Sequence, residues 1–116
     1  MNNVTGRNNY LDLGMETGST FFQLYHEFQG DVVGLDQSVN HAAYAKAKAE
    51  LILPTQALNR THLTGSKDLF AIAESLHKKF DLVTVGAQVD NFGNVDRFFE
   101  FVKEKLLTQE GTLALT

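Results

Sequence analysis

The 116-residue sequence contains no cysteine, and its only proline is Pro54. Without cysteine, the chain can form no disulfide bond and no zinc site with thiolate ligands. Apolar runs are also short, and none approaches the roughly 18 residues that a membrane-spanning helix needs. The polar start, MNNVTGRNNY, lacks the apolar core of a signal peptide. We therefore expect a cytoplasmic protein with no membrane partner.

Positive charge is sparse as well. The net charge is −4, and the only adjacent basic residues are Lys78 and Lys79. Because nucleic-acid binding favours a basic face, we expect no nucleic-acid partner. The four histidines lack metal-ligand spacing, so we expect no metal site; they are His26, His41, His62 and His77.

What the chain does contain is an ordinary globular balance, with 43% hydrophobic and 21% charged residues. We expect a flexible lead over residues 1–9 and one domain over residues 10–116. Short apolar runs predict five strands, at 10–13, 31–35, 60–64, 82–85 and 112–115. Apolar residues at helical spacing predict four helices, at 19–28, 42–53, 68–80 and 95–107.

The alternation of strands and helices predicts the architecture. Ser38 is a suitable N-cap for the second helix, Pro54 stops that helix, and Gly111 breaks the last one. Right-handed crossovers then give an α/β, Rossmann-like open parallel sheet in the order 3-2-1-4-5, with helices on both faces. In such a sheet the ligand site lies at the carboxyl ends of the strands, where the strand order reverses.

The first strand runs through a glycine turn into a helix, as Asp12-Leu13-Gly14-Met15-Glu16-Thr17-Gly18. Such a turn presents backbone N–H groups to an anionic or polar ligand, although a tight turn without a ligand is the alternative. Asp36 follows Gly14 by 22 residues. An acid at about 20 residues from the glycine turn is the expected partner of ribose hydroxyls. The alternative is an acid that merely favours a helix start.

Five segments in this order resemble those of class I S-adenosylmethionine-dependent methyltransferases. LDLGMETGS resembles the glycine motif, whose usual form is LDLGCGTG, and VVGLDQS resembles the acidic second motif. FDLVTVG, NVDRFFEFVKEKLL and GTLAL resemble the fourth strand, the next helix and the fifth strand. The nearest subgroup is that of trans-aconitate-type methyltransferases, and the resemblance covers about residues 10–116.

The resemblance implies a methyltransferase that acts on a small molecule, with S-adenosylmethionine as cofactor and a carboxylate as one candidate acceptor. A carboxylate acceptor needs little acid–base help, so we name no catalytic residue. The resemblance assigns the methionine part of the cofactor to Asp12, Gly14 and Gly18, the ribose to Asp36, the adenine to Asp68 and Leu69, and the floor of the site to Gly86 and Ala87.

The sequence departs from the family pattern in three places. Glu16 stands at the middle glycine of the turn, where it adds bulk and negative charge beside the cofactor. Residues 88–92 lack the aromatic residue and histidine common in the subgroup. The sequence stops after the fifth strand, where the family continues into a strand hairpin, so we expect self-association through that strand.

Two other functions remain open. Glu16 and the missing hairpin favour a degenerate, non-enzymatic remnant that acts as a binding module. An NAD-dependent oxidoreductase is the third reading, although the spacing of Gly14 and Gly18 does not fit the pattern Gly-x-Gly-x-x-Gly.

Overall fold

The structure is a computed structural model that describes residues 8–86 and 94–116. Its centre is a five-stranded sheet in the order β3-β2-β1-β4-β5, and every pair of neighbouring strands is parallel. The strands are β1 (Tyr10–Leu13), β2 (Val32–Asp36), β3 (Thr61–Gly65), β4 (Phe80–Val85) and β5 (Leu107–Leu115). The strand order predicted from the sequence is confirmed, and the fold is a Rossmann-like open parallel sheet.

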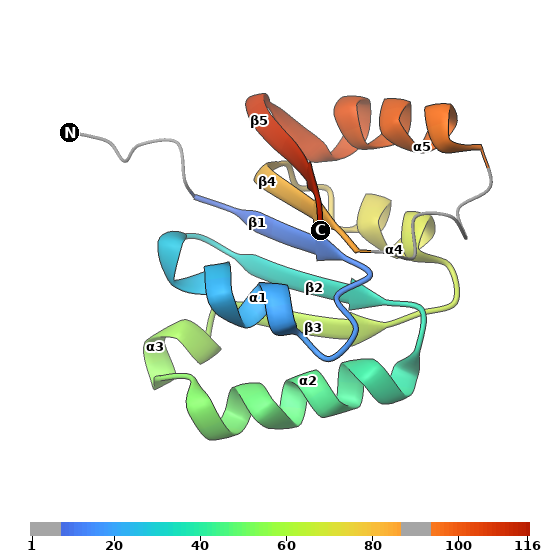
Figure 1. Cartoon of the computed structure of the whole chain (residues 1–116). Helices are drawn as coiled ribbons and strands as arrows, with labels where there is room; N and C mark the ends of the chain where they lie inside the picture. The colour runs from blue at the N-terminus through green and yellow to red at the C-terminus, as the bar shows by residue number, and fades with distance from the viewer. Residues whose placement is uncertain (1–7, 87–93) are drawn as a thin grey trace.

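Helices cover both faces of this sheet (Figure 1). One face carries the helices that connect β1, β2 and β3, while the other carries those that connect β3, β4 and β5. The first group is α1 (Ser19–Leu24), α2 (Val39–Ile52) and α3 (Thr55–Leu58). The second group is α4 (Leu69–Ser75) and α5 (Val95–Phe101), which continues into one π-helical turn over Val102–Leu106. None of the helices in the described ranges is both long and apolar enough to span a membrane.

The alternation of side chains along β1 divides the core into two layers. Tyr10 faces α1, where its ring centroid lies 5.9 Å from that of Phe21. Leu11 and Leu13 face the other way and pack with the apolar side chains of α4 and α5. By the same alternation Asp12 lies on the α1 side of the sheet, which places an acid in the layer that also holds Tyr10 and Phe21.

Two predicted helices end earlier than their apolar spacing indicates. α1 ends at Leu24 and a short 3-10 turn follows. Phe28 remains buried because its extended backbone places its ring on that of Tyr10, with the two ring centroids 5.0 Å apart. α4 ends at Ser75, and His77 adopts a left-handed φ of 49° that turns the chain. Phe80 therefore begins β4 instead of closing the helix. Helical spacing correctly predicted that Phe28 and Phe80 are buried. Both residues are buried from extended backbone, however, and not from a helix.

The end of the chain also differs from its prediction. β5 begins at Leu107, five residues before the predicted strand, and its register with β4 shifts between Phe80 and Leu82. Gly111 lies in this irregularity, where a Cβ atom would come 2.9 Å from the Phe80 carbonyl oxygen. Gly111 therefore accommodates a bulge in a strand and does not end a helix.

The amino ends of the strands, called the amino edge of the sheet below, are held together by residues that the sequence assigned to the flexible lead. The backbone N–H groups of Asn8 and Asn9 each donate to Asp81 Oδ2 at 2.9 Å. The Asn9 side chain accepts a hydrogen bond from Asp31 N at 2.9 Å. These contacts fix the entry into β1; the rest of the predicted lead, residues 1–7, lies outside the described residues.

Candidate functional site

The strand order reverses between β1 and β4, and two of the predicted site glycines meet there. Leu13 and Val85 are register partners, and Gly14 and Gly86 follow them directly. Gly86 N donates to Leu13 O at 3.0 Å. A Cβ atom on Gly86 would lie 2.6 Å from Gly14 O, so only glycine allows β4 to approach the turn this closely.

The turn from Gly14 to Gly18 has left-handed backbone at three positions. The φ angles are 72° at Gly14, 56° at Glu16 and 97° at Gly18. A left-handed conformation costs a residue with a side chain roughly 1 kcal/mol or more, which explains why the middle position suits glycine. The Glu16 side chain is exposed, so it does not fill the turn itself. The predicted departure at Glu16 is thus a matter of backbone strain as well as charge.

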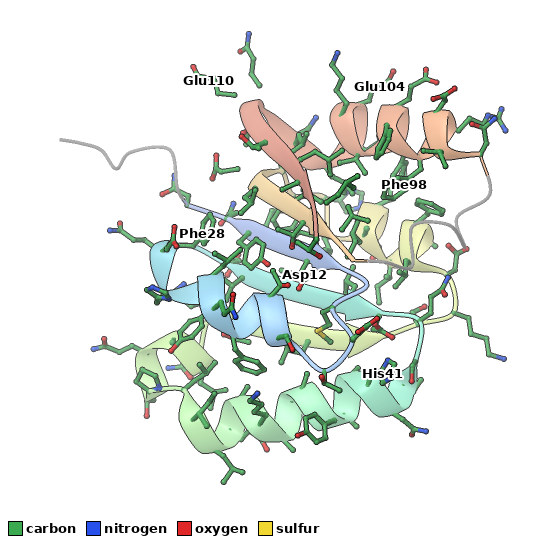
Figure 2. All side chains as sticks on the ribbon, viewed as in Figure 1. Asp12, Phe28, His41, Phe98, Glu104 and Glu110 are labelled. Atoms are coloured by element: carbon green, nitrogen blue, oxygen red, sulfur yellow. The ribbon has the colours of Figure 1, made fainter. Side chains whose placement is uncertain are left out.

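Asp36 holds this turn against the end of β2 and also contacts His41, which Figure 2 labels. Its Oδ2 atom accepts a hydrogen bond from Glu16 N at 2.8 Å. Its Oδ1 atom accepts one from Ser38 N at 2.8 Å and lies 3.2 Å from His41 Nδ1. The Asp36 side chain is completely buried. The spacing thus predicted that the acid lies close to the glycine turn, and in this structure its carboxylate contacts protein donors.

Asp12 lies behind the turn and is only 1% exposed. Its Oδ2 atom has no hydrogen-bond partner. The pKa of Asp12 is raised to about 7, mainly by burial and in smaller part by the nearby charges of Asp36 and Glu16, whereas a hydrogen bond with Thr84 opposes the shift. A buried carboxylate oxygen without a donor is uncommon in folded proteins, so Asp12 is a candidate to receive a polar group of a ligand. Figure 2 shows Asp12 among the side chains near β1.

Asp68 is the N-cap of α4 and Leu69 is the first residue of that helix, which follows the carboxyl end of β3. The Asp68 side chain is exposed and caps α4 by accepting a hydrogen bond from Ala71 N at 3.0 Å. Leu69 is 2% exposed and packs in the core, so only its main chain could face a ligand. Both residues lie beyond the same sheet edge as Gly14 and Asp36. Ala87, which the sequence assigns to the floor of the site, and residues 88–92 lie outside the described residues.

Sequence reasoning missed two contacts, one beside the glycine turn and one across the middle of the sheet. Ser38 caps α2, as predicted, by accepting a hydrogen bond from His41 N at 3.1 Å, and this places the His41 ring against Asp36. Tyr10 Oη lies 2.8 Å from Thr84 Oγ1 across β1 and β4. The spacing of three residues from an N-cap was the signal for the first contact. Period-two alternation on two adjacent strands was the signal for the second.

A metal site finds no support in residues 8–86 and 94–116, where no group of three or more His, Cys, Asp or Glu side chains could hold an ion. A pocket of about 310 Å³ does lie between α4 and α5. Its walls are Phe70, Phe98 and Phe101, and its rim carries Asn94 and Arg97. Its aromatic walls and its guanidinium suit a small anion with an apolar body.

No protein-family model matches the sequence, and no curated protein is significantly similar to it. Solved structures do match. One is an S-adenosylmethionine-dependent methyltransferase from Thiobacillus denitrificans in complex with S-adenosyl-L-homocysteine, with a TM-score of 0.72 and 17% identity over 94% of this chain and 41% of that chain. The glycopeptide N-methyltransferase MtfA, complexed with S-adenosylmethionine, has a TM-score of 0.68 and 24% identity over 93% of this chain and 46% of that chain.

A third match, the cyclase SpnF, has a TM-score of 0.71 and 21% identity over 95% of this chain and 38% of that chain. The chain thus spans less than half the length of each of these three proteins. At such identities the likeness is one of fold, and one fold can serve several activities. The chain has the Rossmann-like fold found in S-adenosylmethionine-dependent methyltransferases.

Proposed function

We propose that this chain carries the S-adenosylmethionine site of a methyltransferase that acts on a small molecule. The observation that supports it best is the contact of the Gly14–Gly18 turn with Asp36, beside the point where the strand order reverses. Ligands of open α/β sheets bind at this point, and an acid at the end of the second strand suits ribose hydroxyls. The motifs and the fold agree with this placement.

The residues of this edge fit the cofactor. The Asp12 Oδ2 atom lacks a donor, and an ammonium group of an amino acid would supply one. We propose that Asp12, Gly14 and Gly18 hold the methionine part, that Asp36 binds the ribose, and that Asp68 and the Leu69 main chain face the adenine. When bound, this cofactor supplies a methyl group on a sulfonium ion.

We propose a small carboxylate as the methyl acceptor, bound in the pocket between α4 and α5. Arg97 lines this pocket, and a guanidinium binds a carboxylate through paired hydrogen bonds. A carboxylate is already a nucleophile and needs no general base. The chain would then act by holding donor and acceptor in line. The nearness to the trans-aconitate-type subgroup rests on the motifs alone and stays a prediction.

A binding module without transfer activity is the second candidate. It is favoured by one observation, namely that three protein donors already contact the Asp36 carboxylate while Glu16 holds a strained turn. In that case the edge would be a vestige of a nucleotide site. An oxidoreductase has no comparable support.

Isothermal titration with S-adenosylmethionine and with NAD separates these functions. We expect heat with S-adenosylmethionine only, and Asp36→Ala should weaken that binding by about 1–3 kcal/mol through loss of charge-assisted hydrogen bonds. Heat with NAD alone would favour the oxidoreductase, and no heat with either would favour the binding module. If Asp36→Ala binds as tightly as the wild type, Asp36 has only a structural role.

A further inference from the structure

Asp36 is the residue that the proposed function assigns to the ribose, yet its carboxylate is sealed in this structure. None of its side chain is exposed, and both of its oxygens accept hydrogen bonds from the protein. A ligand hydroxyl can therefore reach the carboxylate only if one protein donor gives way. The three donors differ in how easily they can do so.

Two of the donors are backbone amides at 2.8 Å, Glu16 N and Ser38 N. Moving Glu16 N would rebuild the glycine turn, and moving Ser38 N would disturb the cap of α2. The third donor, His41 Nδ1, is the most distant at 3.2 Å. Its side chain is 41% exposed, so the ring can rotate into solvent while the backbone stays in place. The imidazole is therefore the donor that yields with the smallest rearrangement.

We propose that His41 is the gate of the ribose site: its imidazole occupies Asp36 Oδ1 in the free protein, and a nucleoside hydroxyl displaces it. This inference rests on the adenosine site of the proposed function. A ligand with ribose hydroxyls replaces the hydrogen bond that the imidazole gives up. A ligand without those hydroxyls leaves the contact between Asp36 and His41 in place, so the gate favours ligands with an intact ribose.

Removal of the imidazole tests the gate, because it leaves Oδ1 open to the ligand. In His41→Ala the backbone N–H that Ser38 caps is retained, and alanine favours helix, so the variant should fold. The matched control is His62→Ala, which removes an imidazole that lies 3.5 Å from Asp31 Oδ1 at the opposite edge of the sheet. The probes are adenosine and 2′,3′-dideoxyadenosine, with affinities measured by calorimetry.

We expect His41→Ala to bind adenosine about fivefold more tightly than the wild type, which is within the range of one modest hydrogen bond. The affinity for the dideoxy probe should not change, and His62→Ala should behave as the wild type with both probes. A merely structural role of His41 would alter both probes alike. Adenosine binding that appears only in His41→Ala also supports the gate, although the proposed function of the natural chain would then fail.

Three results would overturn the gate. Equal adenosine affinities of wild type and His41→Ala would show that the imidazole does not compete, while the proposed site itself would stand. Weaker binding by His41→Ala, or equal gains with both probes, would show that His41 acts in another way. No adenosine binding by either protein would overturn the gate and the proposed function together.

Discussion

The two ends of β2 carry aspartates in opposite circumstances. Asp31, just before the strand, is one-third exposed and pairs with Lys78 and His62. The hydrogen bond from Lys78 holds the pKa of Asp31 below its ordinary value. Asp36, the last residue of the strand, is buried and makes no ion pair with a lysine or arginine of the described chain. Its partners are two backbone N–H groups and one imidazole.

The aspartates of β4 and β1 also differ between the two ends of the sheet. Asp81 at the start of β4 accepts hydrogen bonds on both oxygens, from Asn8 N and Asn9 N on one and from Thr108 Oγ1 on the other. Asp12 near the end of β1 has one oxygen with no donor. At the amino ends of the strands, groups of the chain itself satisfy the carboxylate oxygens of Asp81. At the carboxyl ends, Asp12 retains a buried oxygen to which a ligand can donate.

Asp12→Asn should have the largest effect on stability. Burial raises the pKa of Asp12 from 3.8 to about 7, so between these pH values the folded protein holds a proton that the unfolded chain has released. The free energy of unfolding should therefore fall as pH rises through this window, by on the order of 3 kcal/mol. Denaturant unfolding of the wild type and of Asp12→Asn, at about pH 5 and about pH 8, measures how far the free energy of unfolding falls in each protein.

The asparagine variant should lack this loss. Asp31→Asn is the matched control at the amino edge, and its effect has the opposite sign. Because the pKa of Asp31 is lowered in the folded state, its contribution to stability is present above the unfolded pKa and is lost as pH falls through the folded pKa. Equal pH dependence in wild type and Asp12→Asn would contradict the assignment of a raised pKa to Asp12.

Replacement by alanine should cost more stability at Asp36, the last residue of β2, than at Asp31, which precedes the strand. Asp36→Ala leaves the N–H groups of Glu16 and Ser38 without their acceptor in a buried place, which should cost about 2–3 kcal/mol of unfolding free energy. Asp31→Ala removes a partly exposed ion pair, which should cost at most about 1 kcal/mol. Urea denaturation at neutral pH compares the two. Similar losses would show that the two ends of β2 are not distinguished in this way.

Glu16→Gly should improve the proposed site. Glycine adopts the φ of 56° without strain and removes a negative charge from the turn that we propose to hold the methionine part of the cofactor. We expect S-adenosylmethionine to bind more tightly by at least about 1.4 kcal/mol, a tenfold change. Thr17→Gly, in the same turn but without positive φ, should have no such effect. Weaker binding by Glu16→Gly would mean that Glu16 itself contacts the ligand.

The smallest expected effect is self-association through β5, the outermost strand of the sheet. Among the described strands β5 pairs only with β4, and the Leu115 side chain is 62% exposed. We propose weak self-association through β5, which would raise the apparent mass in light scattering as the concentration increases. Leu115→Lys should reduce this rise. A wild-type protein that stays monomeric over a wide concentration range would contradict the proposal.

The topology could be predicted from the sequence because alternating strands and helices leave few arrangements once crossovers are right-handed. The contact between the glycine turn and Asp36 followed from spacing. The position of the His41 ring could not be derived so simply, since it depends on how Ser38 caps α2 after β2 has ended. Leu69 shows the same limit, because its burial in the core depends on contacts among elements far apart in sequence.

The most direct test of the central claim is a map of backbone amide chemical shifts during titration of the isotope-labelled protein with S-adenosyl-L-homocysteine. The account predicts shifts at the carboxyl edge of the sheet, at Gly14, Glu16, Gly18, Asp36 and Asp68, with no change at Asp31 and Asp81 on the amino edge. Shifts confined to the amino edge, or no shifts at saturating ligand, would contradict it.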